Sequence, residues 1–324
     1  MNGEMLVADM GGTNARFALA SYTDGKVSIR EKRGYRAAEF PTLIDAAKAF
    51  LDAVGTKPRR ACFAVAGPVI DDVVDFTNSP WTLPVSETKA ALSLETLHVV
   101  NDFYALAAGA LHLPEKGFEV VRAGAGDPSA PRVVLGPGTG FGQALVVPVD
   151  GAHRVVATEG GHVGVSPGTE EELAVFAELA RAAPRVFVER AVSGPGIVNL
   201  YRALSALAGD APAFDSPDDV TQAALAGSDA RAVRTVELFC ELLGRAAGDA
   251  VLGCGARGGV ILGGGILPKI RDFFRRTRFV ACFLDKARQR EYVEDVPVRL
   301  IVDDAAALYG AGYVLAAAGA PALR

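Results

Sequence analysis

The sequence predicts a two-domain α/β protein with a ligand cleft between its domains. Its 324 residues exceed the length at which one hydrophobic core usually stops growing, so two domains are expected. Short apolar runs alternate with helical patterns, which is the order of elements in α/β folds. Residues 5–20 and residues 132–147 show the same pattern, a strand, a glycine turn and a second strand. Each pattern stands at the start of a stretch that is long enough for a domain. This repetition indicates a duplicated architecture that holds one polyphosphate from both sides.

Composition excludes several classes of protein. Half of the residues are hydrophobic and 22% are charged, which is typical of globular chains. A net charge of -5 and the lack of a basic run argue against a nucleic-acid partner. Neither a signal peptide nor an apolar run of membrane-spanning length is present, so we expect a cytoplasmic protein with no membrane partner. The four cysteines lack the spacing of a zinc site or a disulfide framework, so most are expected as small core residues. The four histidines also lack metal-ligand spacing.

A glycine-rich hairpin is predicted at residues 5–20. A short apolar run ends at Asp9, turn residues follow, and strand-like residues resume at Phe17. Consecutive backbone N–H groups at the tip of such a turn form a nest that binds anionic oxygens. A carboxylate beside a phosphate site indicates a divalent cation, so Asp9 is a candidate ligand for Mg²⁺, directly or through water. The alternative is an ordinary hairpin with an exposed aspartate. The candidate phosphate-binding residues are Asp9, Gly11, Gly12, Thr13, Asn14 and Arg16.

The rest of the first block alternates strand and helix. Residues 41–54 carry a helical apolar stripe, with Pro41 in the first turn. Asp102 lies between a strand-like run and an Ala-rich helix, and it has two interpretations. It is either the N-cap of that helix or a carboxylate at the strand end where open α/β sheets bind ligands. The only tryptophan, Trp81, is expected to anchor packing. The expected strands are 27–33, 61–66 and 97–100, and the expected helices are 41–54 and 103–111.

Two more glycine turns follow strands in the second block. Gly138, Thr139 and Gly140 lie between strand-like residues 132–135 and 143–147. Gly263, Gly264 and Gly265 end a strand-like run near residue 262. Because this turn carries no side chains, a flat ring or a sugar can lie against its backbone.

Polar side chains between these turns suit a hydroxyl-rich ligand. Glu159 and His162 flank two glycines, and the alternative is a plain glycine turn with a satisfied histidine. Glu189 ends a strand-like run, 185–189, and its simplest interpretation is a surface ion pair with Arg190. The expected helices are 170–181, 193–208, 217–226 and 229–252, followed by a strand at 297–302 and a helix at 305–318.

Several nucleotide-binding families are excluded by their motifs. The chain has no Gly-x-x-x-x-Gly-Lys-Ser/Thr loop and no protein-kinase motif set. Its first glycine turn leads into a strand and not a helix, which excludes a Rossmann fingerprint. Taken together, the motifs resemble those of the bacterial glucokinase family, which belongs to the actin-like, sugar-kinase and Hsp70 superfamily. The zinc-binding cysteine cluster of a related repressor and kinase group is absent, which favours the zinc-free glucokinase branch. The residues that carry the resemblance, almost end to end, are 8–16, 77–81, 101–103, 135–140, 159–162, 189–190 with 193–196, and 262–266.

The resemblance implies a fold, an activity and a set of ligands. It implies a two-domain actin-like ATPase fold of the ribonuclease H-like type, divided as residues 1–110 with 300–324 and 111–299. The implied reaction is ATP-dependent phosphorylation of glucose at its 6-hydroxyl, the first step of glycolysis, with Mg²⁺ as cofactor. A homodimer is also implied.

The resemblance also implies residue roles. Residues 9–16 and 138–140 are expected to bind ATP phosphates, and residues 263–265 are expected near the adenosine. Asp102 is the implied base. The implied sugar contacts are Asn78, Asn101, Asp102, Glu159, His162 and Glu189.

Three residues depart from the family pattern. Gly164 stands where a larger residue is expected, and Phe141 and Gln143 vary the second glycine turn. These changes flank the implied ligands, so they bear on specificity more than on reaction type. The alternatives are a sugar-sensing regulator, an actin-like ATPase without a sugar site, and a kinase that uses another hexose or polyphosphate.

Overall fold

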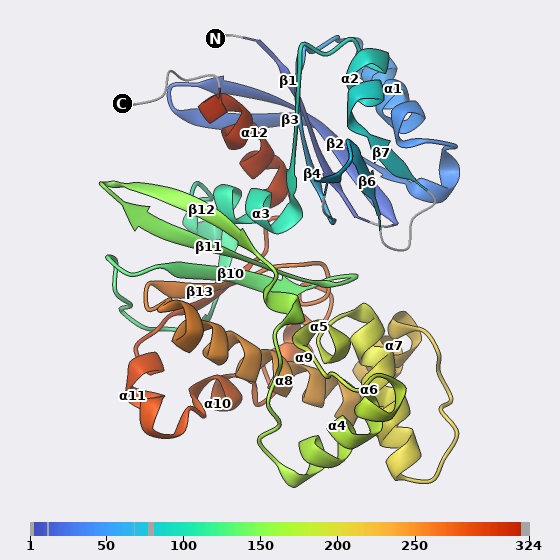
Figure 1. The fold of residues 1–324 in the computed structure, drawn as a ribbon, viewed down its shortest axis with the longest axis vertical. Coiled ribbons are helices and arrows are strands. Elements are labelled where there is room, and N and C mark those ends of the chain that lie inside the picture. The colour runs from blue at the N-terminus through green and yellow to red at the C-terminus, as the bar shows by residue number, and fades with distance from the viewer. Residues whose placement is uncertain (1–2, 12, 68, 77–80, 319–324) are drawn as a thin grey trace. The chain divides into compact units, whose positions relative to one another are not determined.

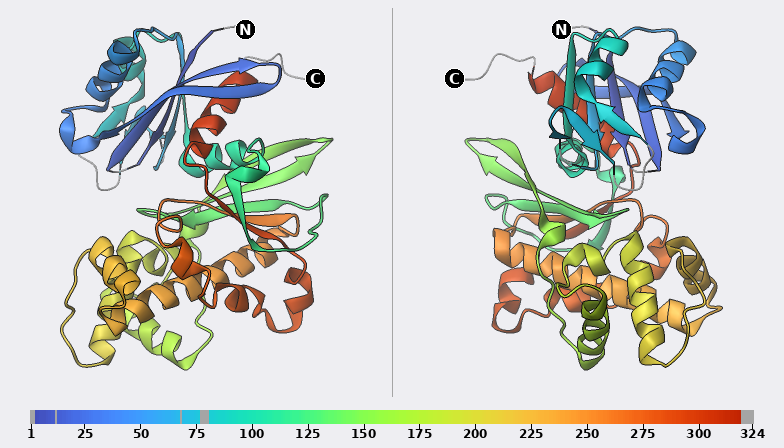
Figure 2. Two further views of the ribbon diagram at one scale, coloured as in Figure 1. Left: turned by 180° about the vertical axis from the view of Figure 1, so that it is seen from behind. Right: turned by 45° about the vertical axis from the view of Figure 1, so that its right-hand side comes forward.

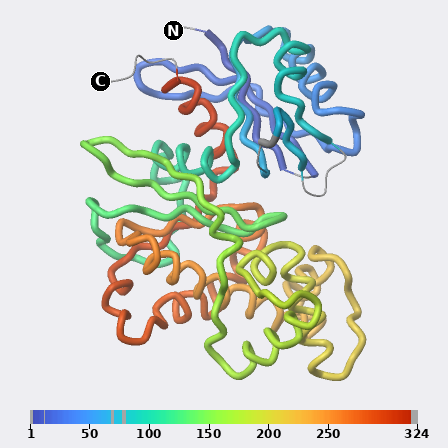
Figure 3. Tube along the Cα trace, in the orientation of Figure 1, coloured from blue at the N-terminus to red at the C-terminus, as the bar shows by residue number. Residues whose placement is uncertain are grey.

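The computed structural model describes residues 3–11, 13–67, 69–76 and 81–318 (Figure 1). The chain divides into two compact units, Met1–Gly117 with Asp303–Arg324, and Phe118–Val302. Both chain ends therefore belong to the first unit, which the chain leaves after Gly117 and re-enters at Asp303 (Figure 3). The domain limits expected at 110/111 and 299/300 stay a prediction.

A five-stranded sheet forms the centre of the first unit. Its strands lie in the order β3-β2-β1-β4-β8. The first three form an antiparallel meander, whereas β1, β4 and β8 are parallel. A small antiparallel sheet, β5-β6-β7, follows β4 in the chain. The strands are β1 (Met5–Met10), β2 (Asn14–Thr23), β3 (Lys26–Arg36), β4 (Arg60–Val65), β5 (Val69–Ile70), β6 (Val73–Asp75), β7 (Thr82–Pro84) and β8 (Thr96–Asn101).

Helices cover both faces of this sheet because its central strand alternates its side chains between two cores. Leu6 and Ala8 of β1 pack in one cluster with α1 (Leu43–Val54). Met5 and Val7 pack in another with α12 (Ala306–Ala318). This period of two is the geometry of an extended strand. The short helix α2 (Val85–Ala91) lies beside α1 in Figure 1.

Helix starts in this unit differ from two expectations. Helix α1 begins at Leu43, and its N-cap Thr42 accepts a hydrogen bond from the Asp45 N–H at 3.1 Å. Pro41 precedes that cap, so its placement in the first turn was wrong. Helix α3 (Asp102–Ala110) is capped by Asn101 and not by Asp102. Thr and Asn are both strong caps because their short side chains reach the free N–H groups of the first turn.

Helices α3 and α12 approach through two glycines. A Cβ at Gly109 would lie 2.0 Å from the carbonyl oxygen of Ala306. A Cβ at Gly310 would lie 1.7 Å from the carbonyl oxygen of Ala105. Real Cβ atoms do not come this close to backbone oxygens, so both positions need glycine. This contact sets the position of α3, the helix that begins with Asp102.

The second unit repeats the sheet order of the first. Its six strands run β12-β11-β10-β13-β14-β9, with β12 to β10 antiparallel and β10, β13 and β14 parallel. Strand β9 adds an antiparallel edge. The strands are β9 (Phe118–Arg122), β10 (Arg132–Pro137), β11 (Phe141–Val149), β12 (Ala152–Thr158), β13 (Gly259–Leu262) and β14 (Val298–Ile301). The duplicated architecture expected from the two glycine hairpins is therefore present at the level of topology.

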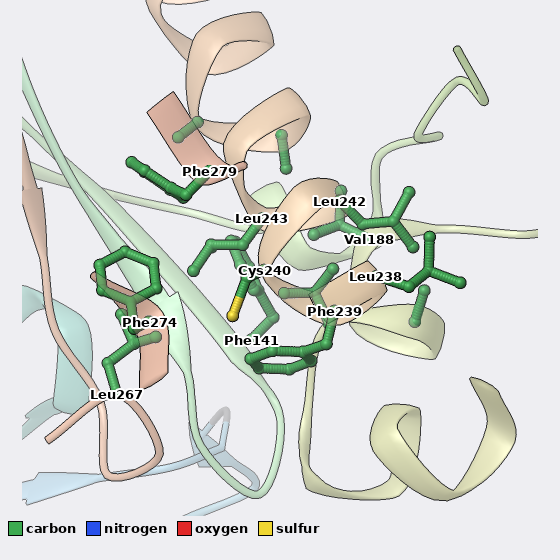
Figure 4. Close-up of a cluster of buried hydrophobic side chains, with 14 of the residues drawn as sticks. Phe141, Val188, Leu238, Phe239, Cys240, Leu242, Leu243, Leu267, Phe274 and Phe279 are labelled. Atoms are coloured by element: carbon green, nitrogen blue, oxygen red, sulfur yellow. The ribbon is translucent and has the colours of Figure 1, made fainter. Parts of the chain in front are cut away.

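The helices of the second unit gather on one side of its sheet, in both views of Figure 2. The longest, α8, supplies the buried centre shown in Figure 4, where Phe239, Leu242 and Leu243 pack. The helices are α4 (Glu170–Ala182), α5 (Val188–Ala191), α6 (Gly194–Leu207), α7 (Pro217–Ala226), α8 (Ala230–Cys254), α9 (Arg271–Phe274), α10 (Phe279–Leu284) and α11 (Arg290–Val293).

The strand expected at residues 185–189 is wrong. Phe187 makes a single bridge to Gly164, and helix α5 begins at the next residue, Val188. The side chain of Val188 is buried in the α8 core. Tertiary packing therefore overrides the strand preference of this apolar run.

The cysteines behave as small core residues. Cys62, Cys240 and Cys282 are buried free thiols, and Cys254 is half-buried. Burial raises the pKa of the Cys62 thiol to about 12. Among the described helices, none combines the length and apolarity needed to cross a membrane.

Candidate functional site

The first glycine turn connects β1 and β2 as a tight hairpin, as expected. Met10 pairs with Ala15, and the Gly11 N–H donates to the carbonyl oxygen of Asn14 at 3.0 Å. That N–H is used inside the turn, so the expected nest of free N–H groups does not include Gly11. Thr13 and Asn14 are exposed beside it. Gly12 lies outside the described residues.

Asp9 and Arg16 face each other across this hairpin. They are direct partners in the ladder, and Arg16 Nη1 lies 3.3 Å from Asp9 Oδ2. The same nitrogen reaches the carbonyl oxygen of Asp304 at 3.4 Å. Burial raises the pKa of the Asp9 carboxyl, and the positive charge of Arg16 opposes that shift. The guanidinium is thus engaged by the protein as well as exposed to solvent, and a phosphate would share it with Asp9.

The Asp9 carboxylate would suit a magnesium ion that is held mainly by phosphate. Among the described residues, no group of three or more His, Cys, Asp or Glu side chains could enclose a metal. Mg²⁺ commonly takes one or two protein carboxylates and completes its shell with water and substrate phosphates. One partly buried carboxylate next to the turn meets this requirement.

Asn101 and Asp102 lie at the carboxyl end of β8. Asn101 Oδ1 accepts the Tyr104 N–H at 3.1 Å, which is the capping bond of α3. Asp102 Oδ1 accepts the N–H of Phe103 at 2.8 Å. Strands β1, β4 and β8 are parallel neighbours, so Asp9 and Asp102 belong to the same edge of the sheet. Ligands of open α/β sheets bind at this edge.

The loop before β7 is only partly described. Asn78, an expected sugar contact, lies outside the described residues. Trp81 is buried, and its Nε1 donates to the carbonyl oxygen of Phe40 at 3.0 Å. Its expected packing role is confirmed.

The second glycine turn follows β10 and is bonded to its surroundings at both ends. The Gly138 N–H donates to the carbonyl oxygen of Gly140 at 2.8 Å, and the Gly138 carbonyl accepts the N–H of Gly194 at 2.9 Å. The Phe141 N–H donates to Glu189 Oε2 at 2.7 Å. These bonds do not involve the N–H groups of Thr139 and Gly140.

The third glycine turn packs against the second. The Gly263 N–H donates to the carbonyl oxygen of Leu135 at 2.9 Å. Gly264 has a φ of +88°, and a Cβ there would lie 2.2 Å from the carbonyl oxygen of Pro137. Gly265 has open space around its Cβ position. Close approach of two backbones and the positive φ therefore explain Gly264, whereas the Cβ position of Gly265 faces open space.

Glu159, His162 and Glu189 come from two neighbouring segments, a short 3₁₀ turn and helix α5. Glu159 precedes the short 3₁₀ turn η3 (Gly160–His162) and His162 ends it. The ring centroids of His162 and Phe187 are 5.2 Å apart. The Val188 N–H donates to the carbonyl oxygen of Val163 at 3.0 Å, which joins η3 to α5. Glu189 bonds to Phe141, while Arg190 Nη2 donates to the Leu179 carbonyl at 3.3 Å. These contacts replace the surface ion pair considered from the sequence.

The expected site residues that the structure describes fall in two sets, one in each unit. The first set lies at the β1 and β8 ends, and the second joins both glycine turns of the second unit to Glu189 and His162. Sequence reasoning missed the structural part played by Gly194 and Phe141, whose N–H groups fix the second turn. The Ser-Gly-Pro-Gly motif at 193–196 was the available signal, since Ser193 caps α6 and so brings Gly194 to Gly138.

Comparison with known proteins identifies one family over nearly the whole chain. A family model described as glucokinase matches residues 6–318. The chain belongs to the glucokinase family. A glucokinase of Stenotrophomonas maltophilia (strain K279a) is 43% identical over 316 residues, covering 95% of this chain and 93% of the relative.

Solved glucokinase structures share this fold. The crystal structure of a glucokinase from an Antarctic psychrotroph is 38% identical, with a TM-score of 0.84 and coverage of 98% of this chain and 100% of the other. A glucokinase from Balamuthia mandrillaris, solved in complex with glucose, is 23% identical with a TM-score of 0.78 and coverage of 97% and 94%. At that identity the likeness shows the fold alone, the actin-like fold of sugar kinases.

Proposed function

We propose that this protein transfers the γ-phosphoryl group of ATP to the 6-hydroxyl of glucose and releases glucose 6-phosphate and ADP. The observation that carries the proposal is the glucokinase family match over residues 6–318, a range in which all the expected site residues lie. The positions of Asp9, Asp102 and the glycine turns at the carboxyl ends of parallel strands support it. The product places the reaction at the first step of glycolysis.

Asp102 is the proposed base. The 6-hydroxyl oxygen attacks the γ-phosphorus, the bond from that phosphorus to the β,γ-bridging oxygen breaks, and the hydroxyl proton passes to the Asp102 carboxylate. Aspartate is one of the side chains that serve as positioned proton acceptors in such reactions. Its place in the first turn of α3 holds the carboxylate at a defined position.

The glycine turns are proposed to bind the nucleotide. Thr139 and Gly140 offer N–H groups to phosphate oxygens, and Thr13, Asn14 and Arg16 offer side-chain donors. The open face at Gly265 suits the adenosine. Phosphoryl transfer depends on positioning and charge neutralisation more than on covalent chemistry, which is what such turns supply.

Asn78, Asn101, Glu159, His162 and Glu189 are proposed to bind the sugar hydroxyls. Asn101 Oδ1 is occupied by the helix cap, so the amide nitrogen is the group it offers. An analogue that lacks a hydroxyl would leave such groups unpaired, and sites built this way reject it strongly.

A coupled assay of ADP release tests the proposal. The purified protein is given ATP or polyphosphate with glucose, mannose, fructose, galactose or N-acetylglucosamine. We expect glucose and ATP to give the highest kcat/KM. Turnover of ATP that does not depend on any sugar, or a clear preference for another hexose or donor, would contradict it.

Asp9 is proposed to bind magnesium, which when bound to ATP neutralises phosphate charge. We expect Asp9→Ala to raise the Mg²⁺ concentration needed for half-maximal rate by about tenfold, because a carboxylate partner of the ion is lost. The measurement is a magnesium titration at saturating glucose, with Asp45→Ala as a control carboxylate in the same unit. An unchanged titration in Asp9→Ala would remove the proposed role.

The family resemblance also supports a homodimer that acts in the cytoplasm. Light scattering coupled to gel filtration measures the mass in solution. A mass near 34 kDa, that of one 33.7 kDa chain, would contradict the dimer.

A further inference from the structure

We propose that Glu189 is a positioning residue for the second glycine turn, defined here as residues 138–141. Its carboxylate would hold the turn in the shape that receives the nucleotide, beyond its proposed contact with the sugar. The inference rests on the proposed function for the identity of the ligands. It rests on the geometry of the second unit for the contact itself.

The carboxylate of Glu189 is built into the turn. Oε2 accepts the Phe141 N–H at 2.7 Å, a short bond from a backbone amide to a charged group. A Cβ at Gly140 would lie 2.4 Å from the same oxygen and 3.2 Å from Cδ. The three nearest heavy atoms to that position all belong to Glu189. Gly140 has no positive φ, so the carboxylate and not the backbone angle explains why this residue is a glycine.

Both ends of this contact are anchored in one hydrophobic core. The side chains of Phe141 and Val188 are 7% and 2% exposed and belong to the same buried cluster (Figure 4). Phe141 follows the turn directly, and Val188 precedes Glu189. The backbone at each end of the contact therefore cannot move far without disturbing the packing around α8.

Two backbone contacts complete the support of the turn. The Gly194 N–H, at the start of α6, holds the Gly138 carbonyl at 2.9 Å. A Cβ at Gly161 in η3 would lie 2.4 Å from the carbonyl oxygen of Phe141. The segments that carry His162, Glu189 and the α6 cap therefore surround the turn, and Glu189 is the side chain that bonds to it.

One carboxylate can serve two ligands because its two oxygens accept several hydrogen bonds. Oε2 is committed to the turn, which leaves Oε1 for a sugar hydroxyl. A sugar bound to Oε1 would restrict the carboxylate and, through Oε2, the turn. By linkage, the nucleotide would then strengthen sugar binding by the same factor.

The decisive experiment compares Glu189→Gln with Glu189→Ala by calorimetric titration with ADP and Mg²⁺ in the absence of sugar. Both variants remove the negative charge, but only Gln keeps an oxygen that can accept the Phe141 N–H. We expect Glu189→Ala to bind ADP about tenfold more weakly than Glu189→Gln, since it leaves a buried donor unpaired. Equal affinities in the two variants would overturn the proposal.

A second comparison uses Gly140→Ala in two backgrounds. In the natural chain the added methyl meets Glu189 Oε2, and we expect ADP binding to weaken about fivefold or more. In the Glu189→Ala background the obstacle is gone, and the same methyl should change ADP binding less than about twofold. If the effects of Gly140→Ala and Glu189→Ala on ADP affinity are additive, the contact between the added methyl and the Glu189 carboxylate is not the cause of the weaker binding.

The control variant is Glu159→Ala, an exposed carboxylate with the same proposed sugar role. We expect it to leave sugar-free ADP affinity unchanged, and a loss equal to that of Glu189→Ala would overturn the special role of Glu189. Failure of the natural chain to phosphorylate glucose would contradict the proposed function and leave the ADP comparisons interpretable. Normal phosphorylation with equal ADP affinities would contradict this inference alone.

Discussion

Replacing Asp102 with Asn is expected to lower kcat for glucose phosphorylation by about two to four decades, the usual contribution of a positioned proton acceptor. Asn keeps the size of the side chain and one acceptor for the Phe103 N–H, which Asp102 Oδ1 bonds at 2.8 Å. The cap of α3 belongs to Asn101 and is untouched. The variant therefore removes the base while the helix start is preserved. Steady-state kinetics at saturating ATP and glucose measure the effect.

Asp45→Asn is the matched control for this prediction. Asp45 is also a carboxylate in the first turn of a helix of the same unit, where it accepts from the Thr42 hydroxyl. We expect kcat within about twofold of the natural value, because helix-end charge contributes only a fraction of a kcal/mol. Near-normal turnover in folded Asp102→Asn would remove Asp102 as the base.

Replacing Arg245 with Met is expected to lower the free energy of unfolding by about 3–5 kcal/mol, the cost of breaking a buried ion pair on one side. The Arg245 side chain, on α8, is 8% exposed and that of Glu172, on α4, is 0% exposed. Arg245 Nε lies 2.9 Å from Glu172 Oε2, and Nη1 lies 2.9 Å from Asp285 Oδ2. Met fills similar volume but leaves Glu172 charged and buried. Urea denaturation followed by circular dichroism measures the loss.

A double variant separates charge from packing at this site. Glu172→Leu combined with Arg245→Met removes both charges, and we expect it to recover most of the lost stability because apolar replacements of buried pairs are often neutral. Arg181→Met is the control, since Arg181 pairs with Glu178 at 76% exposure and should cost less than about 1 kcal/mol. A double variant no more stable than the single would show that packing, and not the unpaired carboxylate, causes the loss.

Local signals in the sequence predicted most elements correctly. Helix α7 runs from Pro217 to Ala226 as expected, because Ser216 caps it and Gly227 ends it in the left-handed conformation. Each glycine turn follows a strand as predicted. Asp102 was expected to be either the cap of α3 or a ligand carboxylate, and the cap is its neighbour Asn101. Asn and Asp cap helices equally well, so residue type does not distinguish two adjacent candidates. Residues 185–189 were mistaken for a strand because Val186, Phe187 and Val188 favour extended structure. Burial of Val188 in the core around α8 outweighs that local preference.

By itself the sequence determined the family, the hairpin at residues 5–20 and the chemistry available at Asp9, Asp102 and Glu189. These follow from residue type and from neighbours a few positions away, which govern turns, caps and periodicity. Only the tertiary structure decided that Glu189 bonds to Phe141, 48 positions earlier in the chain, and that Gly310 meets Ala105. Such contacts depend on which faces of distant elements pack together, and no short-range pattern encodes that choice.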